Sequence, residues 1–232
     1  MIFVVAEIGV NWNGDFELVK EMMNESKKIG FDAVKFQSFN QKIIKDHPQK
    51  EILLNSSISE KNVKDINEIA GKIGIEWFST PMYSDAVDFL EPFVNKYKIR
   101  EFDGRKLLEN SSTELTEKIF QTNKEVFVSC ESSPIKSIYY NRQNIKWLYC
   151  VPKYPCSLED LNFKNFRDFY GYSNHCNEII APITTAMLGA KLIEIHITSD
   201  KQKDFIDNPV SFDYDESSEI VKQIRNIERI EK

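Results

Sequence analysis

The sequence feature that most restricts the fold of this chain is a repeated alternation of short apolar runs with longer segments of helical spacing. Eight such runs recur at intervals of roughly 25–30 residues, a pattern typical of parallel strands joined by helices. Eight units favour a closed (β/α)8 barrel. An open doubly wound sheet is the alternative, but the turn after the first run, GVNWNG, lacks a glycine-rich phosphate fingerprint. The predicted strands are Ile2–Ile8, Ala33–Phe39, Ile75–Thr80, Tyr97–Glu101, Glu125–Cys130, Trp147–Val151, Phe169–Ser173 and Leu192–Ile197.

The segments between the runs predict the helices and a single domain. Apolar residues at helical spacing, bounded by capping residues and glycines, mark most of the connections. No linker, low-complexity tract or shift in composition divides the 232 residues, so we expect one barrel over residues 1–232. The predicted helices are Asp15–Lys28, Ser59–Lys72, Ser84–Phe93, a helix from Ser112 or Thr113 to Thr122, Ile180–Gly189 and Asp215–Ile230.

Composition narrows the classes of partner. The net charge of −6 disfavours binding to nucleic acid or to an anionic membrane surface. No apolar run approaches the length of about 18 residues that a membrane span needs. The four cysteines form no CxxC pair, so we expect reduced thiols in a cytoplasmic protein.

Polar residues gather where the predicted strands end, which is the catalytic face of a (β/α)8 barrel. Lys35 and Lys98 lie inside strands, where a charge requires a partner or a ligand. His175 follows one predicted strand and His196 lies near the end of the next. The pair predicts either a shared metal ion or substrate, or two imidazoles with local partners. The residues of this kind are Glu7, Lys35, Gln37, Ser79, Thr80, Lys98, Ser129, Tyr154, Ser173, His175, Glu194 and His196.

A set of motifs runs in one order along nearly the whole chain. They are AEIGVNWNG (6–14), GFDAVKFQSF (30–39), FSTP and VDFLE (78–91), YKI (97–99), YCVPKYPCSLEDLN (149–162), GYSNH and APITTAMLGAKLIEIHIT (171–198), and IRNIE (224–228). Together these motifs resemble the sialic acid synthase family, whose members condense phosphoenolpyruvate with an N-acetylated sugar such as N-acetylmannosamine. The family fold is a (β/α)8 barrel, in agreement with the alternation of runs.

The resemblance implies roles for individual residues. His175 and His196 match the pair that holds a divalent metal, typically manganese, which polarises the sugar aldehyde. Glu7 matches an acidic residue that meets the sugar, and Glu7, Lys98 and His196 are the implied catalytic residues. The implied substrate-binding residues are Lys35, Thr80, Ser129 and Ser173 on the phosphoenolpyruvate side, and Tyr154 and Asp207 on the sugar side.

The resemblance also shows where this chain departs from the family pattern. Glu101 replaces a ligand-binding serine, which predicts repulsion of an anionic substrate unless Arg100 or Arg105 pairs with it. Glu131 and Pro152 are two further departures near the same pocket. No stretch matches the small antifreeze-like domain that follows the family's barrel, so we expect a barrel-only member. The expected partners are the two small-molecule substrates, and a homodimer is left open.

Two other functions remain open from the sequence. One is a Schiff-base aldolase that uses Lys98 or Lys35 as its nucleophile, although two metal-matching histidines would then be idle. The other is a catalytically silent barrel that binds a sugar or serves as a partner subunit. Substitutions in the phosphoenolpyruvate pocket, with both histidines retained, are what such a loss of activity would leave.

Overall fold

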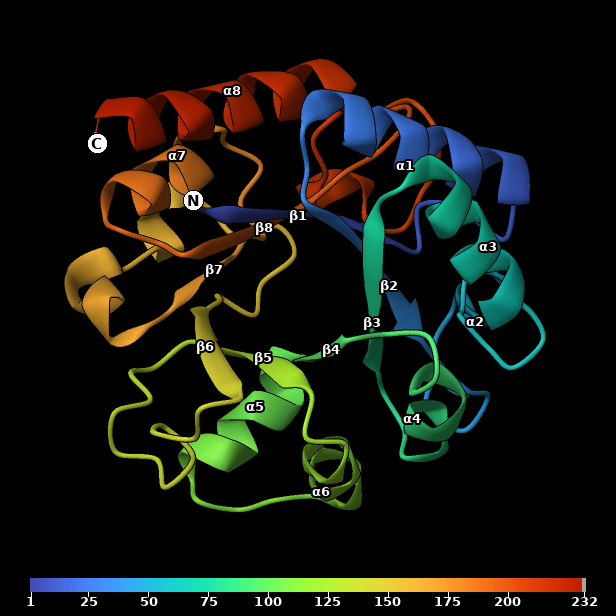
Figure 1. Cartoon of the computed structure of the whole chain (residues 1–232), viewed down its shortest axis with the longest axis horizontal. Helices are drawn as coiled ribbons and strands as arrows, with labels where there is room; N and C mark the ends of the chain where they lie inside the picture. Colours follow the sequence, from blue (N-terminus) through green and yellow to red (C-terminus); the bar gives the residue numbers. More distant parts are fainter. Residues whose placement is uncertain (231–232) are drawn as a thin grey trace.

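The structure is a computed structural model that describes residues 1–230, and its strands form one closed parallel barrel (Figure 1). Each strand pairs with the next in chain order, and β8 pairs with β1. The predicted (β/α)8 barrel is therefore confirmed. The strands are β1 (Phe3–Gly9), β2 (Ala33–Ser38), β3 (Glu76–Pro81), β4 (Lys96–Ile99), β5 (Glu125–Cys130), β6 (Ile145–Tyr149), β7 (Gly171–Ser173) and β8 (Leu192–His196).

Helices surround the barrel, and the six predicted ones are present with small shifts at their ends. Two further helices occur that are not among the predicted ones: α2 lies between β2 and α3, and α5 begins two residues after the end of β4. The helices are α1 (Phe16–Ile29), α2 (Lys50–Asn55), α3 (Val63–Ile73), α4 (Asp85–Leu90), α5 (Glu101–Leu108), α6 (Glu114–Gln121), α7 (Ile180–Met187) and α8 (Tyr214–Ile230), with short 3-10 turns η1 (Leu158–Asp160), η2 (Phe163–Asp168) and η3 (Asn208–Val210).

One predicted strand boundary is wrong in a way that affects the site. The strand predicted over Tyr97–Glu101 ends at Ile99, and Glu101 is the first residue of α5. Acidic residues in the first turn of α5 and basic residues in its last turn both favour this helix through its dipole. Glu101 therefore lies at the start of a helix and does not belong to strand β4.

Helix α1 shows how the local sequence sets these boundaries. The Asp15 side chain accepts hydrogen bonds from the amides of Glu17 and Leu18, which caps the helix at its start. Gly30 ends it with a φ of 100°, in the left-handed region that favours glycine. Met22 and Met23 are among the residues of α1 buried against the barrel, as the helical spacing predicts.

The two ends of the chain meet on one side of the barrel. In Figure 1 the red helix α8 runs beside the blue helix α1. Arg225 of α8 donates to the backbone oxygen of Ile2 at 2.7 Å and to Oδ2 of Asp32 at 2.8 Å, which fastens the last helix to the first strands. No helix within residues 1–230 has the length and apolar character needed to cross a bilayer.

The barrel interior is apolar in its middle layer and polar at the carboxyl ends of the strands. The rings of Phe78 and Phe127, on β3 and β5, meet edge to face with centroids 5.7 Å apart. Thr80 and Ser129 lie two residues further along the same strands and therefore face the same interior one layer higher. The aromatic layer thus forms an apolar floor beneath the polar residues at the carboxyl ends of the strands.

Candidate active site

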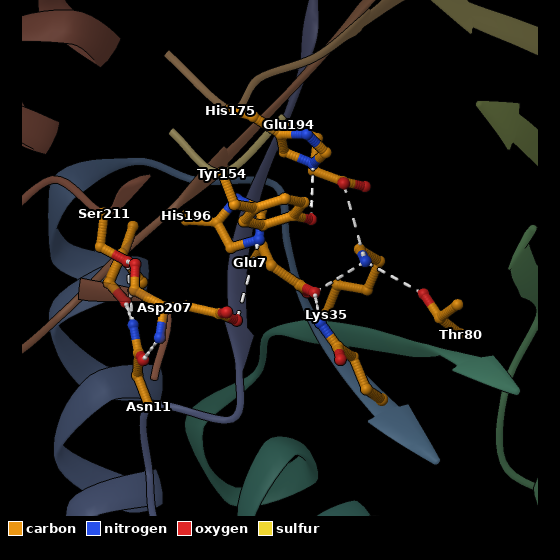
Figure 2. A network of polar contacts seen from close by, with 12 residues as sticks. Glu7, Asn11, Lys35, Thr80, Tyr154, His175, Glu194, His196, Asp207 and Ser211 are labelled. Carbon is orange, nitrogen blue, oxygen red and sulfur yellow. Dashed lines mark hydrogen bonds and ion pairs between the residues drawn. The ribbon is translucent and has the colours of Figure 1, made fainter. Parts of the chain in front are cut away.

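A cavity of about 400 Å³ opens at the carboxyl ends of the strands. A volume of this size is within the range of small-molecule sites, and the position is where barrel enzymes place their chemistry. Figure 2 shows part of its polar network. The lining residues are Glu7, Lys35, Gln37, Thr80, Met82, Lys98, Arg100, Glu101, Phe102, Arg105, Ser129, Cys150, Pro152, Tyr154, Ser173, His175, Glu194, His196 and Asp207.

Lys35 lies deep in this cavity and is held by three oxygen atoms. Its Nζ is 2.9 Å from Oε1 of Glu7 and 3.6 Å from Oε1 of Glu194, and it donates to Oγ1 of Thr80 at 3.0 Å. Burial alone would lower the pKa of Lys35, but the two carboxylates outweigh it and the pKa is raised. Lys35 is therefore a fixed positive charge.

Lys98 reaches the same carboxylate from the opposite side of the barrel. Its Nζ donates to Oε1 of Glu194 at 2.8 Å and to Oγ of Ser173 at 3.0 Å, and the Ser173 hydroxyl also donates to Glu194 at 2.8 Å. Burial lowers the pKa of Lys98, whereas the two lysines hold the pKa of Glu194 well below its usual range despite burial. Glu194 is therefore an ionised carboxylate shared between two ammonium groups.

Glu7 has one engaged oxygen and one free oxygen. Its Oε1 accepts from Gln37 Nε2 at 2.7 Å and pairs with Lys35, whereas Oε2 is buried with no hydrogen-bond partner among the described residues. Burial raises the pKa of Glu7. A carboxyl oxygen without a partner in a polar cavity is placed to meet a hydroxyl group of a bound ligand or water.

His175 presents one ring nitrogen to the cavity. Its Nδ1 lies 2.7 Å from the backbone oxygen of Val151, and because a carbonyl only accepts, Nδ1 carries the proton. Nε2 is then an acceptor, and the Tyr154 hydroxyl donates to it at 2.7 Å. Burial, with the nearby His196, lowers the pKa of His175 to about 3, so its imidazole is neutral at physiological pH.

His196 is arranged in the same way beside His175. Its Nδ1 lies 3.2 Å from the backbone oxygen of Asn174, and its Nε2 lies 3.9 Å from Oδ2 of Asp207. Burial and Lys35 lower the pKa of His196 to about 4. Burial and the charge of Glu7 raise the pKa of Asp207 to about 7. The centroids of the two imidazole rings are 5.4 Å apart.

The donor atoms of this pair suit a divalent metal. Both imidazoles are neutral, both point Nε2 away from a backbone carbonyl that fixes the tautomer, and such an outer hydrogen bond is usual for metal-binding histidines. Within residues 1–230, no three His, Cys, Asp or Glu side chains are grouped as a ready metal site. The protein therefore offers two nitrogen ligands, and any further ligand has to come from substrate, from water or from a side-chain shift.

The departures from the family pattern have different positions in the structure. Glu101 lines the cavity, but Arg105 pairs with it and donates from Nε to its Oε2 at 3.2 Å. Arg100 instead donates to Oδ2 of Asp103 at 2.8 Å. Glu131 is exposed and does not line the cavity. The anionic repulsion predicted at Glu101 is thus countered by the neighbouring arginine that the sequence offers.

Every residue predicted from the sequence as catalytic, substrate-binding or metal-binding lines this one cavity. Glu194 is among the polar residues at the predicted strand ends but not among the predicted site residues, although it accepts from Lys98 and Ser173 and lies beside Lys35. The signal that would have found it is the one that marked the lysines, a charge between Ile193 and Ile195 in an apolar run.

Sequence comparisons point to one family. The sequence profile of the NeuB family matches residues 22–232. An uncharacterised protein of Methanocaldococcus jannaschii is 35% identical over 247 residues, which cover 98% of this chain and 71% of that protein. The N,N'-diacetyllegionaminic acid synthase of Legionella pneumophila is 32% identical over 260 residues, which cover 98% of this chain and 72% of that enzyme.

Solved structures share the barrel. The N-acetylneuraminic acid (sialic acid) synthetase of Leptospira borgpetersenii, solved with citrate, superposes with a TM-score of 0.85 at 23% identity and covers 99% of this chain and 84% of its own. A truncated 3-deoxy-D-arabino-heptulosonate 7-phosphate synthase of Thermotoga maritima superposes with a TM-score of 0.71 at 12% identity, covering 99% and 87%. At these identities the likeness is one of fold.

Proposed function

The chain belongs to the NeuB family, and on that premise we propose that it condenses phosphoenolpyruvate with an N-acetylated amino sugar to a nonulosonate and phosphate. We propose further that the reaction requires a divalent metal, with manganese the first to test. One observation carries the proposal: a single cavity joins two buried lysines to a pair of neutral imidazoles. The relative in Legionella pneumophila is by its name an N,N'-diacetyllegionaminic acid synthase.

The lysine side of the cavity supports binding of a small anion. Lys35 and Lys98 are each 3% exposed and each supplies a positive charge at a fixed position. Phosphate and carboxylate groups bind strongly to such charges, especially where water is excluded. Ser129 adds a buried hydroxyl with no partner among residues 1–230, which is free to donate to an anionic oxygen. Phosphoenolpyruvate carries both kinds of anionic group.

The histidine side supports binding of the sugar. His175 and His196 would hold the metal through Nε2, and a bound divalent ion supplies Lewis-acid polarisation of the sugar carbonyl. Tyr154 now occupies Nε2 of His175, so its hydroxyl would be released and become available to a sugar hydroxyl. Asp207 lies beside His196 on the same side and is the second polar contact we assign to the sugar.

Glu7 lies between the two sides and is the residue we assign to proton transfer. In the condensation, the methylene carbon of phosphoenolpyruvate bonds to the sugar carbonyl carbon, whose oxygen takes up a proton. Water adds to C2, the carbon that bears the phosphate ester, and the bond from C2 to the phosphate oxygen breaks. The adding water loses a proton. Oε2 of Glu7 is unpartnered, and burial raises the pKa of this carboxyl above its usual value, which makes it a stronger proton acceptor.

The direct test is phosphate release from phosphoenolpyruvate in the presence of manganese and a panel of N-acetylated hexoses. Turnover with at least one sugar, lost on chelation and restored by metal, supports the whole proposal. Manganese should also raise the melting temperature of the wild type but not of H175Q or H196Q. This comparison measures metal binding independently of enzyme activity. Absence of turnover together with absence of phosphoenolpyruvate binding by calorimetry would overturn the proposal and favour the silent barrel.

A further inference from the structure

The cations that line the cavity differ in how tightly they are held. Lys35 and Lys98 are buried and are paired with carboxylates from other strands. Arg105 is different, because half of its side chain is exposed and its carboxylate partner within residues 1–230 is Glu101, one turn earlier on the same helix. Pairs of this kind contribute little to stability in water, so Arg105 can leave Glu101 at small cost.

The packing of α5 places Arg105 over the end of β5. A Cβ atom added at Gly104 would lie 2.1 Å from the backbone oxygen of Ser129, so only glycine lets the helix approach the strand this closely. Arg105 follows Gly104 and lines the cavity together with Ser129. The Ser129 hydroxyl is buried, with no hydrogen-bond partner in the described part of the chain. An unpartnered hydroxyl and an exchangeable guanidinium group therefore line the same cavity.

We infer that Arg105 exchanges its bond to Glu101 for the phosphate group of bound phosphoenolpyruvate, beside the Ser129 hydroxyl. The inference rests on the proposed function and extends it to a residue of this chain's own helix α5. A guanidinium group binds a phosphate through two parallel hydrogen bonds, and a dianionic phosphate attracts it more strongly than a single carboxylate. Glu101 then acts as a competitor that holds Arg105 in place until the anion arrives.

The test compares four variants by calorimetric titration with phosphoenolpyruvate and by initial rates. R105A and R105Q should weaken phosphoenolpyruvate binding by about tenfold or more, because a charge partner of the ligand is lost. R105K should be intermediate, since it keeps the charge but loses the paired geometry. K106A is the matched control, because Lys106 is the next residue of α5 and does not line the cavity. The KM for the sugar should stay within about twofold of the wild type in all four.

E101Q provides the sharper readout, because it should tighten phosphoenolpyruvate binding by roughly threefold to tenfold by releasing Arg105 and removing a repelling charge. Loss of the repelling charge alone would also raise affinity, so the gain from E101Q should be much smaller in the R105Q background, and an equal gain there would overturn the inference. Equal affinity of R105A, R105Q and K106A, or unchanged or weaker binding by E101Q, would overturn the inference. A wild type that binds phosphoenolpyruvate without turnover would contradict the proposed function. In that case the calorimetric affinities of the same variants would still test whether Arg105 binds the phosphate.

Discussion

Lys98 and Glu194 form an ion pair across the barrel interior, with Nζ of Lys98 on β4 lying 2.8 Å from Oε1 of Glu194 on β8. These strands are four positions apart in the order of the eight-stranded barrel. The same oxygen accepts a hydrogen bond from Ser173 and lies 3.6 Å from Nζ of Lys35. One buried carboxylate therefore compensates two buried ammonium groups, and the polar layer of the cavity depends on it.

The substitution E194Q should destabilise the protein strongly. It leaves Lys98 without a carboxylate partner and Lys35 with Glu7 alone, and an uncompensated buried charge costs about 3–5 kcal/mol. K98M should cost less, because Glu194 keeps Lys35 as a partner. Urea unfolding of the wild type and both variants measures the difference. Equal stability of E194Q and the wild type would show that Glu194 does not carry this charge balance.

The same ion pair bears on the Schiff-base aldolase that the sequence leaves open. A nucleophilic lysine must be neutral, and although burial lowers the pKa of Lys98, its bond to ionised Glu194 favours the charged form. We therefore expect no covalent adduct when the protein is treated with pyruvate and borohydride. Intact-protein mass spectrometry checks this. An adduct on Lys98 or Lys35 would instead support the Schiff-base aldolase function.

The four cysteines should make stability fall in mild alkali. Each is free and buried, and burial, with neighbouring Cys176, raises the pKa of Cys156 from 9.0 to about 12. The unfolded chain therefore releases this proton near pH 9 while the folded protein keeps it. The stabilisation is complete below pH 9 and is lost as pH rises towards 12, by about 1.4 kcal/mol per pH unit for each thiol. Cys130, Cys150 and Cys176 shift in the same direction.

Urea unfolding between pH 8.5 and 9.5 tests this expectation below the range in which tyrosines ionise. The variant C156A should show a shallower loss of stability with pH than the wild type. Iodoacetamide at pH 8 should leave the native protein unmodified and label all four thiols of the unfolded chain. Rapid labelling of the native protein, or a C156A slope equal to that of the wild type, would contradict the expected burial of these thiols.

The barrel and the gathering of polar residues at one end of it can be predicted from the sequence because both depend on local patterns, whereas Asp207 enters only through the family resemblance. Strand alternation is periodic along the chain. A lysine inside an apolar run, such as Lys35, can be recognised as unusual from its sequence neighbours alone, before its ion-pair partner is known. The pairing was not accessible, because Glu194 meets Lys98 only when the barrel closes and joins β4 to β8. Helix α5 is not predicted from the sequence for a related reason. Glycine disfavours a helix, and the close approach to the Ser129 backbone that requires Gly104 is visible only in the folded barrel.

Asn11 should act as a positioning residue for Asp207. Its Oδ1 accepts from the backbone amide of Asp207 at 3.2 Å, and its Nδ2 donates to Ser211 Oγ and to the backbone oxygen of Ile197, each at 2.9 Å (Figure 2). N11A removes these bonds, so the loop that carries Asp207 should shift and stability should fall by about 1–3 kcal/mol. S211A is the milder comparison, since it keeps the bond from Asn11 to Asp207.

In steady-state kinetics, N11A should lower kcat/KM for the sugar by about tenfold or more, because a small misplacement of a positioning group is costly. Phosphoenolpyruvate affinity should change little, since Asn11 lies on the sugar side. An N11A variant with unaltered sugar kinetics would show that Asp207 is held by other contacts. Equal losses for both substrates would point to general damage instead of positioning.

Gly104 should be among the least replaceable glycines of the chain. In G104A the new Cβ would lie 2.1 Å from the Ser129 oxygen and 3.1 Å from Cγ1 of Val128, so α5 must move away from β5. We expect a loss of about 2–3 kcal/mol or more from this overpacking. G71A is the matched control, because a Cβ at Gly71 in α3 meets nothing within 4 Å and should stabilise the helix by about 0.5–1 kcal/mol. Thermal unfolding of both variants measures the contrast, and similar melting temperatures would mean that α5 does not need its close contact with β5.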